Sequence, residues 1–267
     1  METGLYLYCV RPRTDETVEV QRTMSGGEKI QVIPYLELEA ITSEVPIEEF
    51  SSAEIQKKAE EDLDWIKSKV LIHEEVIEQA MRSENSSVLP VIPMQFGAIF
   101  RTREKLKETL YENLEKFRES LKFLTGREEW GVKVFLDMDV FEDFLEKENE
   151  ELLVRNKEAE TLPKGLAFFA KKKTAYKIEE IKERELVKIT DEINEYLANS
   201  AVTLFKAKVL EKDFTLLSNE MIMNRFYLIE EPEITEFKEK TEELKERFNP
   251  LGIEIEITGP WPSYHFA

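Results

Sequence analysis

The sequence predicts an α+β protein of two domains. Short apolar stretches of strand length alternate with longer stretches whose apolar residues recur every three or four positions, as on one face of a helix. The length of 267 residues suits one large or two small domains. The turn at Thr125-Gly126-Arg127 separates two such patterns, so we expect domains at 1–126 and 127–267.

In the first half, the pattern predicts the order β-β-α-β-α. A helix begins at the capping box formed by Ser51 and Glu54, and its apolar stripe runs to Met81. A second stripe runs from Leu106 to Leu124, and Gly126 follows it in a position that favours a left-handed cap. The strands are expected at 5–10, at 30–45 with an interruption at Pro34, and at 88–100.

The second half predicts the order β-α-β-β-α-β, which is the ferredoxin-like arrangement. A helical region is expected from about 139 to 199 with a break near Leu162-Pro163, and a second helix opens at Pro232 and stops at Asn249-Pro250. The strands are expected at 130–136, 201–210, 221–229 and 252–257. We therefore expect a ferredoxin-like second domain and a first domain that is a variant of the same theme.

The composition is strongly acidic. The formal net charge is −19, and 35% of the residues are charged. Such a surface repels phosphate backbones, and the one tight basic run, Lys171-Lys172-Lys173, is best interpreted as a solvated helix face. The strand at 221–229 lacks the consensus of RNA-recognition modules. We expect no nucleic-acid partner.

Cysteine content and hydropathy limit the cellular location. The chain has one cysteine, Cys9, so no disulfide forms within it. The first residues lack the basic and apolar regions of a signal peptide, and no apolar run approaches the ~18 residues of a membrane helix. We expect a cytoplasmic protein without a membrane partner.

The sequence offers little catalytic chemistry. His73 lies on the helical stripe and is expected to be a core or domain-interface histidine, whereas His265 lies in an aromatic tail. Cys9 lies in an apolar strand and is expected to be an inert thiol. Nucleotide-binding glycine motifs, metal-ligand spacings and nucleophile elbows do not occur. We therefore expect a protein that is not an enzyme and that uses no cofactor and no metal.

Two apolar and aromatic stretches remain, at 90–97 and at 259–266. The first is either a core strand with turns or a contact surface. The second either packs on its own second domain, where it would cover an open sheet edge, or contacts a partner. The two alternatives are compatible, because an ordered tail also presents a surface.

These stretches carry a resemblance that spans nearly the whole chain. The sequence resembles the gas vesicle protein GvpF/GvpL family and looks closer to GvpL. The most specific part is the terminal pattern Gly-Pro-Trp-Pro-x-Tyr-x-Phe, in which Ser263 stands where the family commonly has proline. The other matching segments are "LYLYCV" at the start, 62–81, 88–106, 126–137 and 162–173.

The resemblance implies two modified ferredoxin-like domains and a role in gas vesicle formation. Family members are thought to contact the small hydrophobic shell protein GvpA and other accessory proteins, and they bring no catalytic residues. One alternative is a generic ferredoxin-like scaffold that acts only on other accessory proteins. A further alternative is an enzyme with a pocket between the domains.

The hypothesis for the contact surface rests on the two aromatic stretches. A shell protein that faces gas must expose apolar surface before assembly, and such surface aggregates unless it is covered. We expect the tail to form one part of the contact surface and the segment around 93–97 another. The candidate residues are Trp261, Tyr264, Phe266, Pro260, Pro262, Met94 and Phe96.

Overall fold

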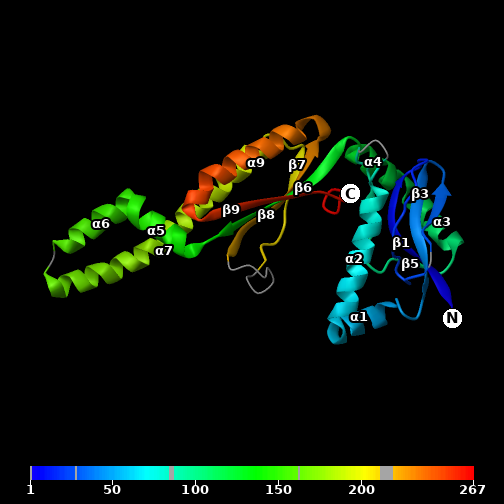
Figure 1. The fold of residues 1–267 in the computed structure, drawn as a ribbon, viewed down its shortest axis with the longest axis horizontal. Helices are drawn as coiled ribbons and strands as arrows, with labels where there is room; N and C mark the ends of the chain where they lie inside the picture. The colour runs from blue at the N-terminus through cyan, green and yellow to red at the C-terminus, as the bar shows by residue number, and fades with distance from the viewer. Residues whose placement is uncertain (1, 28, 84–86, 162, 211–218) are drawn as a thin grey trace. The chain divides into compact units, whose positions relative to one another are not determined.

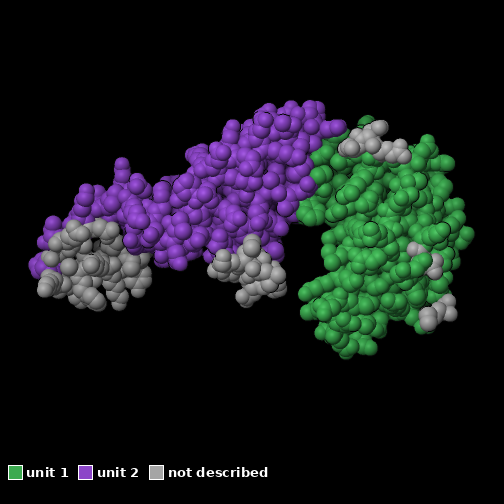
Figure 2. Space-filling view, in the orientation of Figure 1, with its two compact units in different colours: residues 1–129, 260–267 green, residues 130–259 purple. Residues whose placement is uncertain are grey.

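The computed structural model describes residues 2–27, 29–83, 87–161, 163–210 and 219–267, apart from some side chains between 156 and 176. It combines helices with two sheets and divides into two compact units (Figure 2). Unit 1 comprises residues 1–129 and 260–267, and unit 2 comprises residues 130–259. The predicted boundary after residue 126 lies close to the first division.

Unit 1 contains an antiparallel sheet built around β1 (Thr3–Pro12) (Figure 1). The strand order is β2-β3-β1-β4, and β5 also pairs with β1. The other strands are β2 (Gln31–Tyr35), β3 (Leu38–Pro46), β4 (Ile92–Pro93) and β5 (Ile99–Phe100). Because β1 is central and nearly all of it is buried, its side chains organise both faces of the sheet.

The interruption in the segment 30–45 was predicted at the wrong residue. Pro34 lies inside β2 opposite Glu39, and the chain turns at Leu36 and Glu37 instead. Leu36 takes a positive φ of 52° in this turn. Proline is accepted in β2 because this strand lies at the sheet edge, where a missing N–H need not cost a ladder hydrogen bond.

Each helix predicted in the first half is two helices. The first pair is α1 (Ser52–Glu61) and α2 (Leu63–Ala80), and the second is α3 (Arg103–Glu112) and α4 (Leu114–Leu124). Asp62 separates α1 from α2 because its non-helical backbone lets its carboxylate accept the N–H of Trp65 at 3.1 Å. Asn113 separates α3 from α4. Ser51 accepts the Glu54 N–H at 3.3 Å, which confirms this half of the predicted capping box, and Gly126 takes the predicted left-handed conformation.

Helices cover both faces of the unit 1 sheet (Figure 1). Tyr6 and Tyr8 pack with the buried face of α2, whereas Leu5 and Leu7 pack with α3 and α4. The register of β1 against β3 shifts between Leu7 and Cys9, so Cys9 joins the same core as Tyr8. This irregularity lets consecutive β1 residues serve one core, which strict alternation would forbid.

A buried ion pair joins the sheet to the end of α2. The Arg11 side chain is fully buried, and its Nε donates to Glu39 Oε1 at 2.7 Å. Its two other guanidinium nitrogens donate to the carbonyl oxygens of Ala80 and Glu16, each at 2.6 Å. The guanidinium therefore neutralises a buried carboxylate and satisfies a carbonyl at the C-terminus of α2.

Unit 2 follows the predicted order β-α-β-β-α-β. Its sheet has the strand order β7-β8-β6-β9, and its core gathers side chains from α5, α7, α9 and the sheet. The strands are β6 (Arg127–Leu136), β7 (Thr203–Lys206), β8 (Glu220–Glu230) and β9 (Ile253–Trp261). The helices are α5 (Met138–Glu148), α6 (Glu150–Glu160), α7 (Lys164–Ala198), η1 (Glu231–Glu233), α9 (Ile234–Phe248) and η2 (Asn249–Leu251).

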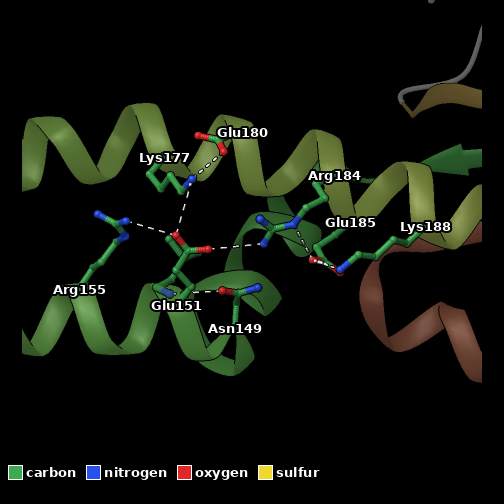
Figure 3. Close-up of polar contacts among 9 residues, drawn as sticks. Asn149, Glu151, Arg155, Lys177, Glu180, Arg184, Glu185 and Lys188 are labelled. Carbon is green, nitrogen blue, oxygen red and sulfur yellow. Dashed lines mark hydrogen bonds and ion pairs between the residues drawn. The ribbon is translucent and has the colours of Figure 1, made fainter.

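Ion pairs link α6 to α7 (Figure 3). Glu151 on α6 meets Lys177 at 3.7 Å and Arg184 at 3.5 Å, both on α7, and meets Arg155 on its own helix at 3.2 Å. Together these cations lower the pKa of Glu151 despite the opposing effect of desolvation, which is the largest single contribution. The high Glu and Lys content is thus used here to bind two charged helices together. The Lys171–Lys173 run lies on α7, but its side chains are outside the described residues.

Replacing Arg11 by methionine tests the buried ion pair. We expect a loss of about 3–5 kcal/mol of unfolding free energy, because the buried Glu39 carboxylate loses its partner. Urea unfolding of Arg11→Met measures this loss. The control is Arg101→Met, which breaks an exposed pair with Glu2 and should cost about 1 kcal/mol or less. Equal effects of the two substitutions would contradict the assignment.

Candidate partner-binding site

Unit 1 contains a pocket of about 610 Å³. Strand β4 and the segment that follows it form one border of this pocket. Its walls come from α2, α3, α4, the 92–96 segment and the C-terminal tail, so it gathers parts of unit 1 that are distant in sequence. The lining residues are Val70, His73, Glu74, Ile92, Pro93, Met94, Gln95, Phe96, Thr109, Asn113, Lys116, Phe117, Ser120, Tyr264 and Ala267.

Hydrogen bonds from the core fix the 94–97 segment. His73 Nε2 lies 3.1 Å from the carbonyl oxygen of Met94, and His73 Nδ1 lies 3.0 Å from the Tyr6 hydroxyl. The Tyr6 hydroxyl also accepts the N–H of Gly97 at 3.1 Å. His73 and Tyr6 therefore hold both ends of the segment that presents Met94 and Phe96.

This arrangement defines the protonation state of His73. A carbonyl oxygen only accepts hydrogen bonds, so Nε2 carries the proton, and Nδ1 accepts from the Tyr6 hydroxyl. Burial lowers the pKa of His73 to about 4, against the smaller opposing effect of its bond to Met94. His73 is thus a neutral core histidine, as predicted, but with two hydrogen bonds. The residue is buried.

Aromatic packing supports the same segment. The Phe96 ring lies edge-on to Tyr6 and His73, with ring centroids 6.2 and 5.9 Å apart. The Tyr8 ring stacks on His73 with centroids 5.9 Å apart. Such aromatic pairs add about 0.5–1.5 kcal/mol each beyond area burial. The wall of the pocket is therefore preformed rather than a loose loop.

The C-terminal tail belongs to unit 1, which corrects the prediction that it packs on the second domain. The fully buried Glu129 carboxylate accepts the backbone N–H of His265 at 3.2 Å and lies 2.6 Å from His265 Nδ1. Burial raises the pKa of Glu129, and the bonds from His265 act in the opposite direction. These contacts between the end of the first segment and the chain terminus explain why residues 260–267 join unit 1.

The structure brings only some of the predicted contact residues together. Met94, Phe96 and Tyr264 line the pocket. Tyr264 is 41% exposed, yet burial around its hydroxyl, followed by the charge of Glu74, raises its pKa. Of the other predicted residues, Pro262 is buried, Trp261 and Phe266 are half-buried, Pro260 is exposed, and none of these four lines the pocket.

The sequence analysis missed the helical wall of the pocket. Phe117 lies within the apolar stripe predicted from Leu106 to Leu124, whereas the polar residues Thr109, Asn113 and Ser120 give no signal. Asn113 interrupts the helix between α3 and α4, and only tertiary structure shows which side chains line the pocket with the 92–96 segment. Glu74 adds a carboxylate whose pKa is raised by burial and by the neighbouring Glu78.

The chain's one thiol is buried in the core of unit 1. Cys9 is fully buried, and burial raises the pKa of its thiol to about 12, which fits the predicted inert role. Within the described residues, His, Cys, Asp and Glu side chains form no cluster of three that could hold a metal ion. Among those residues, no helix is long and apolar enough to cross a membrane.

Comparisons with known proteins identify the family. The model of the family described as "Gas vesicle synthesis protein GvpL/GvpF" matches residues 4–267. The chain therefore belongs to the GvpL/GvpF family of gas vesicle proteins, as the resemblance of its terminal aromatic pattern predicted. It shares 24% identity over 262 residues with gas vesicle protein L of Streptomyces sp. strain CB03234, covering 98% of this chain and 92% of that protein.

Archaeal relatives and solved structures agree. Gas vesicle protein L of Haloferax mediterranei is 27% identical over 212 residues, covering 78% of this chain and 63% of that protein. The crystal structure of GvpF from Anabaena sp. PCC7120 gives a TM-score of 0.74 at 19% identity, covering 99% of this chain and 98% of that one. GvpF from Microcystis aeruginosa gives 0.66 at 18% identity and 98% coverage of both chains. These likenesses show that the fold is shared.

The titration of His73 predicts a loss of stability in acid. Its pKa is about 4 in the folded chain and near 6.5 when unfolded, so the unfolded state binds the proton first as the pH falls. The contribution is present above pH ~6.5 and is lost between pH ~6.5 and ~4, amounting to about 2 kcal/mol between pH 7 and pH 5. Urea unfolding at the two pH values measures it.

The variant His73→Gln is the control for this pH dependence. Glutamine keeps a donor for the Met94 carbonyl but does not titrate, so the difference between pH 7 and pH 5 should shrink by about the same 2 kcal/mol. An unchanged pH dependence in His73→Gln would show that other groups cause it.

The bonds between Glu129 and His265 predict that Glu129→Gln loosens the tail. Loss of the charged acceptor removes about 1.5–3 kcal/mol, which corresponds to roughly tenfold or faster hydrogen exchange at the backbone amides of 263–267. In a His265→Ala background the same substitution should have a smaller effect, because only the bond from the backbone N–H of residue 265 is left to weaken. Additive effects of the two substitutions would contradict the assignment.

Proposed function

We propose that this chain is a non-enzymatic assembly factor or minor component of the gas vesicle. In this role it binds the hydrophobic shell protein GvpA and other accessory gas vesicle proteins in the cytoplasm, limits aggregation of the shell protein and helps nucleate assembly. We also propose that both units are modified ferredoxin-like domains, a description supported in unit 2 by the strand order β7-β8-β6-β9.

The observation that carries the proposal is the shared position of Met94, Phe96 and Tyr264. The two stretches chosen from the sequence as contact surfaces are separated by more than half of the chain, yet they line one pocket of about 610 Å³. A pocket of this size lined mostly by apolar and aromatic side chains is typical of a binding site. Methionine and tyrosine are well suited to it, because both are enriched in protein interfaces.

The preformed wall of the pocket supports binding of the shell protein, and the net charge of the chain supports solubility of the complex. The Tyr6–His73 hydrogen bonds hold the 94–97 segment in place before a partner arrives, which reduces the entropy lost on binding. The net charge of −19 keeps a complex with an apolar protein soluble. The pocket would therefore cover apolar side chains of the shell protein while the remaining surface opposes aggregation.

Co-expression with the shell protein tests this function. The shell protein that stays soluble and is retained on the tagged chain is measured for the parent and for Met94→Ala combined with Tyr264→Ala. We expect retention to fall about tenfold or more, because removal of central interface side chains typically costs 2 kcal/mol or more.

One control and one further variant separate the pocket from the rest of the surface. Tyr111→Ala removes an aromatic residue of α3 that is 69% exposed and does not line the pocket, and it should leave retention unchanged. Trp261→Ala tests the tail outside the pocket: reduced retention would extend the contact surface along the tail, and unchanged retention would leave Trp261 a structural residue. Undiminished retention in the double variant would refute the pocket as the contact site. Retention of accessory proteins alone, even by the parent, would favour the scaffold role.

A further inference from the structure

Unit 2 has an open sheet edge at β9. In the order β7-β8-β6-β9 this strand is at the end, and β6 is its one partner within the described part of the chain (Figure 1). An outer strand presents every second N–H and C=O away from the sheet, where they are available to a further strand. β9 is long for an edge strand, with nine residues from Ile253 to Trp261.

A groove of about 740 Å³ follows this edge. Six successive residues of β9, 253–258, line it together with Lys245, Glu246 and Asn249 from α9 and the turn after it. Successive strand residues point to opposite faces of a sheet. A groove that touches all six therefore runs along the strand itself and leaves room beside its backbone.

The groove is acidic and apolar in alternation. Ile253 and Ile255 are buried towards the core, whereas Glu254 is exposed and Glu256 is half-buried. The cation of the groove, Lys245, pairs with Glu242 at 2.6 Å. No ion pair to Glu246, Glu254 or Glu256 is present among the described residues, so three carboxylates give the groove a negative charge.

We propose that the open edge of β9 binds an extended segment of a partner protein as an added strand, with lysine or arginine at alternate positions and apolar residues between them. Backbone hydrogen bonds to β9 supply the affinity and alternate side chains supply the specificity. Glu254 and Glu256 are two residues apart and share one face, so basic residues at alternate positions of an added strand lie beside them.

The same charges disfavour a second copy of this chain. Pairing two β9 strands side by side would place glutamates near glutamates, and like charges on facing strands are destabilising. Charged residues on an exposed edge are also a means by which proteins avoid uncontrolled pairing of edges. The edge is therefore selective for a basic partner. This surface lies in unit 2 and does not depend on the pocket proposed for the shell protein.

A short peptide of alternating lysine and valine, labelled with a fluorophore, tests the proposal. Its binding is measured by fluorescence anisotropy at about 0.15 M salt, where long-range attraction to an acidic protein is screened. We expect Glu254→Lys combined with Glu256→Lys to weaken binding about tenfold or more. The matched control is Glu146→Lys combined with Glu239→Lys, which makes the same change in net charge at exposed helical positions of unit 2.

Two further measurements address the strand geometry. Of two peptide versions, one N-methylated at its lysines and the other at its valines, one should lose binding about tenfold or more, because it can no longer donate to β9. Hydrogen exchange with the unmodified peptide should protect amides within 253–258. Glu254→Gln with Glu256→Gln replaces the reversed-charge variant if that variant does not fold.

The proposal is overturned if the groove variant and the matched control bind the peptide equally, or if both N-methylated peptides bind as well as the parent peptide. Protection of amides elsewhere would also overturn it. A dimer of the free protein that the peptide dissociates would show that a second copy, rather than a basic partner, occupies the edge.

Discussion

The candidate site depends on the hydrogen-bonded pair of Tyr6 and His73. Tyr6 is a residue of the central strand and His73 a residue of α2, so their contact joins the sheet to the helix that covers it. His73 also donates from Nε2 to the Met94 carbonyl oxygen, and the Tyr6 hydroxyl also accepts the Gly97 N–H. One buried polar network thus sets the strand–helix packing and the wall of the pocket together, and an apolar pair in the same place would fix neither end of the 94–97 segment.

Much of the fold follows from periodicity. Apolar and acidic residues alternate in β9, and apolar residues form stripes on α2 and α9. These patterns predict where each element lies in the sequence, because the burial of one face is the dominant local signal. The breaks at Asp62 and Asn113 were not predicted because both residues lie within continuous apolar stripes, where a polar residue ends one helix and begins the next without interrupting the pattern. The turn at Leu36 was not predicted because the nearby Pro34 suggested that the strand is interrupted there instead.

The site was predictable only in its pieces. Aromatic and methionine residues in the two apolar stretches indicated Met94, Phe96 and Tyr264, which line one pocket. That this pocket is a contact surface stays a prediction. Their meeting depends on the long-range contact between Glu129 and His265, two residues with no common pattern in the sequence. A carboxylate in a strand and a histidine in a tail are each unremarkable alone. The tail follows β9 directly in the sequence, so it was predicted to pack on the second domain. This prediction is wrong because Glu129 of unit 1 binds His265 of the tail.

Electrostatics relates the pocket and the β9 edge to the same acidic composition. In the pocket, burial and Glu78 raise the pKa of Glu74, so a partner that brings a cation there relieves a cost already present in the free protein. At β9, Glu254 and Glu256 lie on the outer strand of the sheet, so a cation is attracted to a position where a strand can also pair. Under the two proposals, apolar contact supplies area in both places, and at β9 the carboxylates select a cationic partner, whereas the pocket also holds Lys116. The excess of acidic residues would then serve selection of partners as well as solubility.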